Sequence, residues 1–157
     1  MMKSRIQFKR IDVCRYRVIY WILNAVPGKC PTNKAIKDYP LFCQWEKGVY
    51  APHFKKIGER YGPFDLAMIE CDQYYKRWID IHMFPEETAL AGINLKAKQT
   101  MPIHWGGFKL VLHDWTDLME RVVKKAKELN VKLLLPQMGK PIFLSQPAAF
   151  TRWWEDL

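Results

Sequence analysis

The sequence predicts an α/β fold, because short apolar runs alternate with helix signals in the order β-α-β-α-β over about residues 64–135. Two segments carry most of this prediction. One is a helix signal that begins at Pro85, and the other is an amphipathic run over residues 115–129. The chain has 157 residues, which is long enough for one domain with a substantial core.

The first strand and the first helix are predicted by local signals. The run FDLAMIE, residues 64–70, follows a Gly-Pro turn and has the length of a strand. A helix is expected from Pro85, because proline suits the first helical position and the carboxylates of Glu86 and Glu87 suit the positive end of the helix dipole. The apolar side of this helix consists of Ala89, Leu90 and Ile93.

The second half of the pattern follows. TMPIH, residues 100–104, is a second strand, in which Pro102 indicates an edge or a strand end. Asp114 is the expected cap of the next helix. The apolar face of that helix consists of Trp115, Leu118, Met119, Val122, Val123, Ala126 and Leu129. VKLLL, residues 131–135, is a third strand, and GKPIFL, residues 139–144, is a candidate fourth. The C-terminal AFTRWWEDL is aromatic, and its adjacent tryptophans cannot both face inward if the segment is extended.

The net charge of +9 is unevenly distributed. Residues 61–157 hold twelve Lys or Arg and twelve Asp or Glu, whereas residues 1–60 hold thirteen basic and four acidic residues. This pattern argues against a DNA-reading domain, which carries its charge on a regular folded face. It divides the chain into a basic, irregular segment, residues 1–48, and an α/β part, residues 49–157. One function for the basic segment is binding of an acidic partner or an anionic membrane surface by a non-catalytic module.

The N-terminus and the cysteines indicate a cytoplasmic protein. The apolar run VIYWILNAV, residues 18–26, follows basic residues as in a signal peptide. It is too short to span a bilayer, and no small-x-small cleavage site follows it, so a buried strand or short helix is expected. The four cysteines lie far apart without a C-x-x-C pair, which predicts reduced thiols.

The histidines are the main candidates for site chemistry. His104 ends the predicted second strand, where open α/β sheets place their sites, and is either a metal ligand or a hydrogen-bonded strand-end residue. His82 lies in the loop before the Pro85 helix and is either a pocket residue or solvated, and His53 is expected in a loop. The carboxylates of Asp72, Asp80 and Asp114 are acids, ligands or helix caps. The sequence has neither a glycine-rich phosphate loop nor a G-x-S-x-G elbow.

Three sequence blocks resemble a known family. They are HFKKIGERYGPFDLAMIECDQY (residues 53–74), WIDIHMFPEETALAGINLKAK (residues 78–98) and MPIHWGGFKL (residues 101–110). In this order they resemble the C-terminal part of the metallo-β-lactamase-fold hydrolases. The nearest likeness is the subfamily of N-acyl-phosphatidylethanolamine-hydrolysing phospholipase D, with the lactonase-like proteins further off. The resemblance covers about residues 50–142 and implies the C-terminal half of an αββα sandwich.

The resemblance also implies roles for two histidines. The position of His104 in the I-H-W-G block is a ligand of the second zinc ion in such proteins, and that of His82 lines the substrate pocket, where it orients substrate or a proton. The family uses two zinc ions to hydrolyse phosphodiester, ester or lactone substrates.

The chain departs from the family pattern in ways that bear on activity. The H-x-H-x-D-H metal motif is absent, and Lys47 stands at the position of the bridging aspartate, with Glu46 beside it. A lysine ammonium cannot bridge two metal ions. Residues 1–48 are therefore expected to be a divergent element or the product of a truncated or frameshifted reading frame. We expect a half-enzyme, inactive alone, with apolar sheet surface that favours self-association or a complementing N-terminal half.

Overall fold

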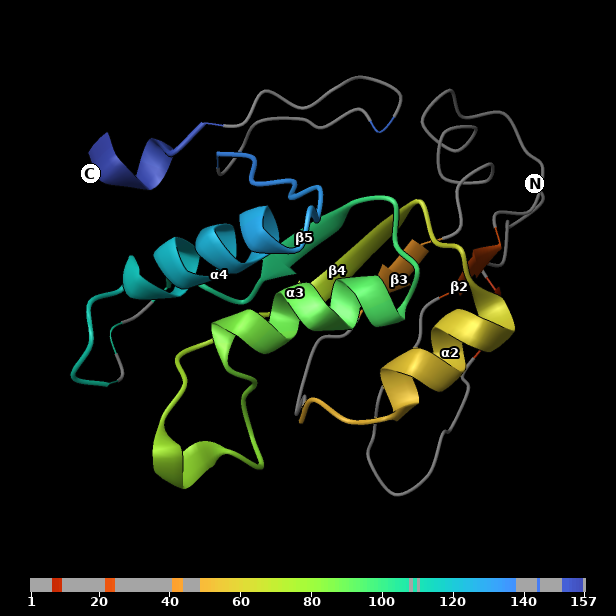
Figure 1. Cartoon of the computed structure of the whole chain (residues 1–157), viewed down its shortest axis with the longest axis horizontal. Coiled ribbons are helices and arrows are strands. Elements are labelled where there is room, and N and C mark those ends of the chain that lie inside the picture. The colour runs from red at the N-terminus through yellow and green to blue at the C-terminus, as the bar shows by residue number, and fades with distance from the viewer. Residues whose placement is uncertain are drawn as a thin grey trace, which may run out of the picture.

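A small parallel sheet with helices packed against it forms the centre of the fold (Figure 1). The computed structural model describes residues 7–9, 22–24, 41–43, 49–107, 109, 111–137, 144 and 151–156. Near the N-terminus, β1 (Gln7–Lys9) pairs antiparallel with β2 (Ile22–Asn24). Within the apolar run of residues 18–26, where a buried strand or short helix was expected, Ile22–Asn24 forms the strand β2, and the rest of the run lies outside the described residues. The candidate fourth strand lies almost wholly outside the described residues, as do Glu46 and Lys47.

The central sheet places the ends of its strands side by side. It contains β3 (Leu41–Cys43), β4 (Leu66–Glu70) and β5 (Thr100–Ile103) in the order β3-β4-β5, and all neighbours are parallel. The register pairs Glu70 with Ile103, so the residues that follow β4 and β5 emerge at the same edge of the sheet. The predicted strands at residues 64–70 and 100–104 are confirmed.

Three helices accompany this sheet. They are α2 (His53–Tyr61), α3 (Pro85–Asn94) and α4 (Asp117–Glu128), and α3 lies across β4 and β5 with α2 and α4 on either side of it (Figure 1). The predicted start of α3 at Pro85 is confirmed, and the Glu87 carboxylate accepts the Phe84 N–H at 2.8 Å. Gly92 brings α3 close to the sheet, because a Cβ there would lie 2.2 Å from Thr100 Oγ1.

Three sequence expectations need correction. His53 does not lie in a loop, because it begins α2. Asp114 does not cap α4, whose N-cap is Thr116. The carbonyl of Asp114 instead accepts the Asp117 N–H at 3.1 Å in the turn before the helix, and the carboxylate of Asp114 pairs with Lys109. The predicted third strand, residues 131–135, forms a single parallel bridge between Leu133 and Thr100.

Among the described residues the core has two parts, of which only the first contains strand residues. One lies beneath α2 and α3 and contains Phe42, Phe54, Ile57, Phe64, Ala67, Ile69, Met83, Ala91 and Leu95. The other lies beneath α4 and contains Cys71, Leu118, Met119, Val122, Leu135, Trp153 and Trp154. The two tryptophans both face inward because the segment is not extended but forms the 3-10 helix η2 (Trp153–Asp156). The observed order of strand, helix, strand, helix and bridge confirms the α/β class.

Among the described residues, no helix has the length and apolar character needed to cross a bilayer.

Candidate functional site

Four polar side chains meet where β4 and β5 end. Glu70 is the last residue of β4, and Asp72 follows it by two residues. His104 directly follows β5, and His82 precedes α3 after the short 3-10 helix η1 (Lys76–Trp78). The structure thus brings together the two histidines singled out from the sequence, with a distance of 6.3 Å between ring centroids.

The Glu70 carboxylate is the buried member of this group. Its side chain is completely buried, and Oε1 lies 2.9 Å from both the backbone N–H of Asp72 and Nδ1 of His82. Oε2 accepts a longer hydrogen bond, 3.4 Å, from the Met83 N–H. Sequence analysis missed this role, although a charged residue at the end of a buried apolar strand is a signal that could have found it.

Asp72 stands between the two imidazoles. Its Oδ2 lies 3.6 Å from Nε2 of His82 and 3.7 Å from Nδ1 of His104, and its Oδ1 accepts the Gln73 N–H at 2.7 Å. These separations are too long for direct hydrogen bonds to the rings but short enough for strong electrostatic attraction to a protonated ring. Of the three aspartates named from the sequence, only Asp72 belongs to this site. Asp114 pairs with Lys109, and Asp80 is exposed.

The backbone of His104 adopts an uncommon conformation. Its φ is 69°, in the left-handed region that few residues other than glycine occupy, and Gly106 follows with φ 75°. Histidine, asparagine and aspartate are enriched among the exceptions, and such residues gather at functional sites. The His104 side chain is 44% exposed, so its imidazole is accessible.

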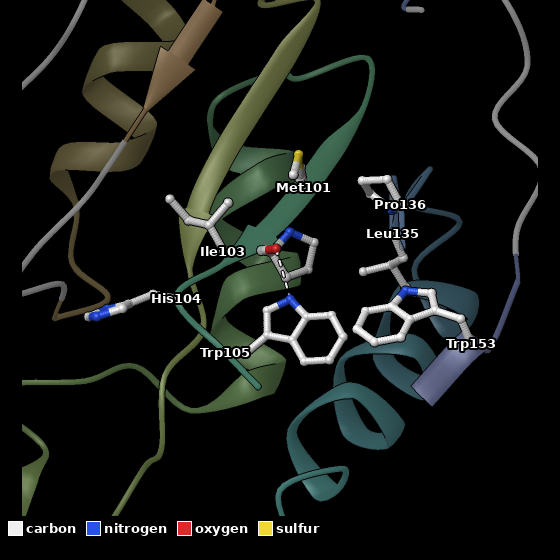
Figure 2. A pocket seen from close by; sticks show the side chains of 8 residues that line it. Met101, Ile103, His104, Trp105, Leu135, Pro136 and Trp153 are labelled. Carbon is white, nitrogen blue, oxygen red and sulfur yellow. Dashed lines mark hydrogen bonds between the residues drawn. The ribbon is translucent and has the colours of Figure 1, made fainter. Parts of the chain in front are cut away.

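An apolar hollow lies beside His104. It has a volume of about 170 Å³ and is lined by Met101, Pro102, Ile103, His104, Trp105, Leu135, Pro136 and Trp153. Figure 2 shows the indoles of Trp105 and Trp153 on one side, while the imidazole of His104 points away from them. The Trp105 Nε1–H donates to the Pro102 carbonyl at 3.1 Å, which fixes that indole. The site therefore has a polar side at the imidazoles and an apolar side at the tryptophans.

The remaining described polar candidates lie elsewhere or are inert. His113 stacks on Tyr74 with 4.4 Å between ring centroids, and its nitrogens face backbone carbonyls. Cys71 has a free, buried thiol, and burial strongly raises its pKa, so it is not a nucleophile. The side chains of the other cysteines are outside the described residues.

The environment of His82 predicts a pH-dependent contribution to stability. Its hydrogen bond to Glu70 raises the pKa of His82 above the ordinary value, which outweighs the opposing effect of burial. A raised folded-state pKa means that this stability is fully present below about pH 6.5, the pKa of an unfolded histidine, and is lost as pH rises through the folded pKa. We therefore expect the difference in Tm between the wild type and His82→Gln to be largest in acid and to shrink as pH rises.

His53 provides a control of opposite sign. Burial lowers the pKa of His53, so its contribution is present above the unfolded pKa and is lost as pH falls. Thermal unfolding of His53→Gln over the same pH series should show a difference in Tm that changes in the other direction. A His82→Gln difference that is flat with pH would contradict the charged pairing of His82.

Comparison with known proteins finds a superfamily match in the middle of the chain. Residues 48–105 match a family model described as "Beta-lactamase superfamily domain". An uncharacterised protein of Mycobacterium tuberculosis (strain H37Rv) is 33% identical over 108 residues, which cover 67% of this chain and 29% of that protein. The N-acyl-phosphatidylethanolamine-hydrolyzing phospholipase D 1 of Caenorhabditis elegans is 41% identical over 59 residues, or 36% of this chain and 17% of that protein.

A solved structure was also found. The metallo hydrolase Igni18 of Ignicoccus hospitalis is 20% identical in sequence to this chain and superimposes with a TM-score of 0.47. The match covers 68% of this chain and 41% of the Igni18 chain. The chain spans less than a third of the length of the mycobacterial relative, whose match covers 29% of that protein. The family model and the name of the nematode relative agree with the resemblance drawn from the three sequence blocks. Residues 48–105 therefore match the beta-lactamase superfamily, and the helices packed on a small parallel sheet in this part of the chain are consistent with part of a metallo-β-lactamase fold.

Proposed function

We propose that this chain supplies one side of the active site of a metal-dependent hydrolase for phosphodiester, ester or lactone substrates, and that it is inactive alone. The observation that carries the proposal is the meeting of His82, Asp72 and His104 at the ends of β4 and β5. Open α/β sheets place their sites at this edge. The activity in the name of the nematode relative, phospholipid hydrolysis, supports the substrate class.

The described residues do not by themselves fit a complete metal site. A catalytic zinc ion takes three protein ligands, and the described part of the chain contains no group of three His, Cys, Asp or Glu side chains able to hold a metal. Nδ1 of His82 is already occupied by Glu70. We propose that His104 is the ligand that this chain contributes and that two zinc ions are held only with ligands from elsewhere. Lys47 and Glu46, at the expected bridging position, lie outside the described residues.

His82 is the proposed catalytic group. Its side chain is 17% exposed, and its Nε2 faces Asp72 and the side of His104, whereas Nδ1 faces the protein interior. An imidazole with one nitrogen held and the other accessible suits general acid or base catalysis at near-neutral pH. The adjacent apolar hollow of about 170 Å³ would accommodate an apolar part of the substrate.

Zinc content after chelation and reloading tests this proposal. We expect the wild type to bind zinc substoichiometrically and to lose it on dialysis, as measured by mass spectrometry of metal per monomer. The His104→Asn variant should bind several-fold less. Asparagine is chosen because it tolerates the left-handed backbone at φ 69° while it removes the imidazole.

The matched control is His113→Asn. His113 is also an imidazole in this half of the chain, but its ring stacks on Tyr74 and its nitrogens face backbone carbonyls, so its replacement should leave zinc content unchanged. Equal zinc in wild type and His104→Asn would refute the ligand role of His104. One or two firmly held zinc ions per chain would refute the incomplete site.

Partners are part of the same proposal. The exposed large apolar side chains among the described residues are Tyr75, Ile79, Ile81, Ile93 and Leu112. We propose that this chain self-associates or binds a complementing N-terminal half, and light scattering of the zinc-loaded sample would show the molar mass. Binding of an acidic partner or membrane surface by residues 1–48 rests on the charge distribution alone, and liposome sedimentation at low salt would test it.

A further inference from the structure

We propose that Glu70 is the positioning residue for His82, which it holds with the ring hydrogen on Nδ1 so that Nε2 is the nitrogen that serves the site. This inference rests on the proposed function, since it assigns His82 to the active site. The inference gives a role to Glu70, for which the sequence predicted none. Both Glu70 and His82 belong to this chain.

The Glu70 carboxylate is itself held rigidly. The backbone carbonyl of Glu70 accepts the Thr88 hydroxyl at 3.0 Å, and β-sheet pairing opposes Glu70 to Ile103. The Asp72 N–H and the Met83 N–H both point to the carboxylate, at 2.9 Å and 3.4 Å. A completely buried carboxylate with this many donors cannot turn to another partner without leaving them unpaired. Glu70 is thus a fixed acceptor aimed at one edge of the His82 ring.

The fixed acceptor determines which ring nitrogen carries hydrogen. A carboxylate only accepts hydrogen bonds, so Nδ1 of His82, 2.9 Å from Glu70, has to be the donor. A neutral imidazole has one N–H, and Nε2 is then left with a lone pair directed into the site. This is the arrangement of an oriented general base. The inner nitrogen, Nδ1, bonds to a carboxylate, and the outer nitrogen, Nε2, can bond to a substrate or a water molecule.

Asp72 completes this arrangement from the other side. Its Oδ2 lies 3.6 Å from Nε2 of His82, too far to occupy that nitrogen but close enough to attract the proton that Nε2 would take up. His82 therefore lies between a carboxylate that orients it and a carboxylate that stabilises its charged form.

A structural role for Glu70 would give a different result. If Glu70 merely supported the loop at Met83, its replacement would change stability without changing the hydrogen on the His82 ring. The test is therefore made on the ring nitrogens. Long-range ¹H–¹⁵N correlation spectra of histidine-labelled, chelator-treated full-length chain identify the protonated nitrogen of each neutral ring.

In the wild type we expect His82 to carry its hydrogen on Nδ1. In Glu70→Met, which keeps the length of the side chain but has no carboxylate to accept from Nδ1, the hydrogen should move to Nε2 in most molecules. The matched control is Glu87→Gln. Glu87 belongs to the same segment and accepts the Phe84 N–H at 2.8 Å without contacting His82, so the Nδ1–H form should persist.

Three results would overturn the assignment. They are an Nε2–H form of His82 in the wild type, an unchanged Nδ1–H form in Glu70→Met, and a switch in Glu87→Gln. If Glu70→Met does not fold, Asp72→Asn provides the second variant. It leaves Glu70 and His82 in place and should keep the Nδ1–H form, and a switch to Nε2–H would assign the control of the ring hydrogen to Asp72 instead. Since these spectra require no metal and no turnover, they decide the role of Glu70 separately from the zinc measurement, which decides the proposed function.

Discussion

Replacing Trp154 with alanine is expected to lower the free energy of unfolding by about 3–5 kcal/mol, the range for removal of a large buried aromatic side chain. Trp154 is 1% exposed in the core part beneath α4. Its ring packs edge-on against Trp105 and Trp153, with 5.8 Å and 6.1 Å between centroids. Its Nε1–H also donates to Glu120 Oε1 at 2.9 Å, a bond that alanine cannot replace.

Urea denaturation followed by circular dichroism would measure this loss. The control Trp154→Phe keeps most of the ring but removes the bond to Glu120, so we expect it to lose clearly less than the alanine variant. A loss within about 0.5 kcal/mol for Trp154→Ala, as for a surface substitution, would show that the C-terminal segment is not part of the core.

Gly58→Ala is the second substitution with a large expected effect. A Cβ at position 58 in α2 would lie 2.0 Å from the carbonyl oxygen of Asn94 and 2.8 Å from the Cα of Leu95, at the end of α3. These are backbone atoms, which cannot move aside as a side-chain tip can. Alanine favours a helix over glycine by up to about 1 kcal/mol, but overpacking costs about 1–3 kcal/mol or more. We expect a net loss near the upper end, about 2–3 kcal/mol.

The chain offers a matched control for that substitution. A Cβ at Gly107 would have no neighbouring atom within 4 Å, and the backbone there is not left-handed, so Gly107→Ala should change stability by less than about 0.5 kcal/mol. Thermal unfolding of both variants would compare them. Equal losses at the two positions would mean that α2 and α3 are not in close contact at Gly58.

The sequence predicted the elements whose signals are local. Pro85 and the carboxylates after it mark the start of α3, and the result agrees to the residue. The start of α4 was misplaced because Asp114 and Thr116 are both good capping residues, and only the turn geometry chooses between them. The apolar run at residues 131–135 became a single bridge because a strand also needs a partner along its length, which no local pattern reveals.

The site was predicted in part for the same reason. The positions of His104 and His82 beside a strand end and a helix start left their roles open, and only the family resemblance favoured site roles for them. The structure brings the two rings to 6.3 Å between centroids, and the roles stay predictions. Glu70 was missed because its importance comes from burial and from partners of its carboxylate up to 13 positions away. The limit placed on the adjacent tryptophans at the C-terminus applied to an extended backbone. The segment forms a 3-10 helix instead, and both indoles face inward.

The close approach of Gly92 to Thr100 affects the distance between the two imidazoles of this site. His82 precedes α3, and His104 follows β5, so the spacing of the two imidazoles depends on how deeply the helix is seated on the strand. Because a Cβ at position 92 would lie 2.2 Å from Thr100 Oγ1, even one added carbon would lift the helix or push the threonine aside. A substitution at position 92 could therefore widen the spacing of the two imidazoles without replacing any residue of the candidate site.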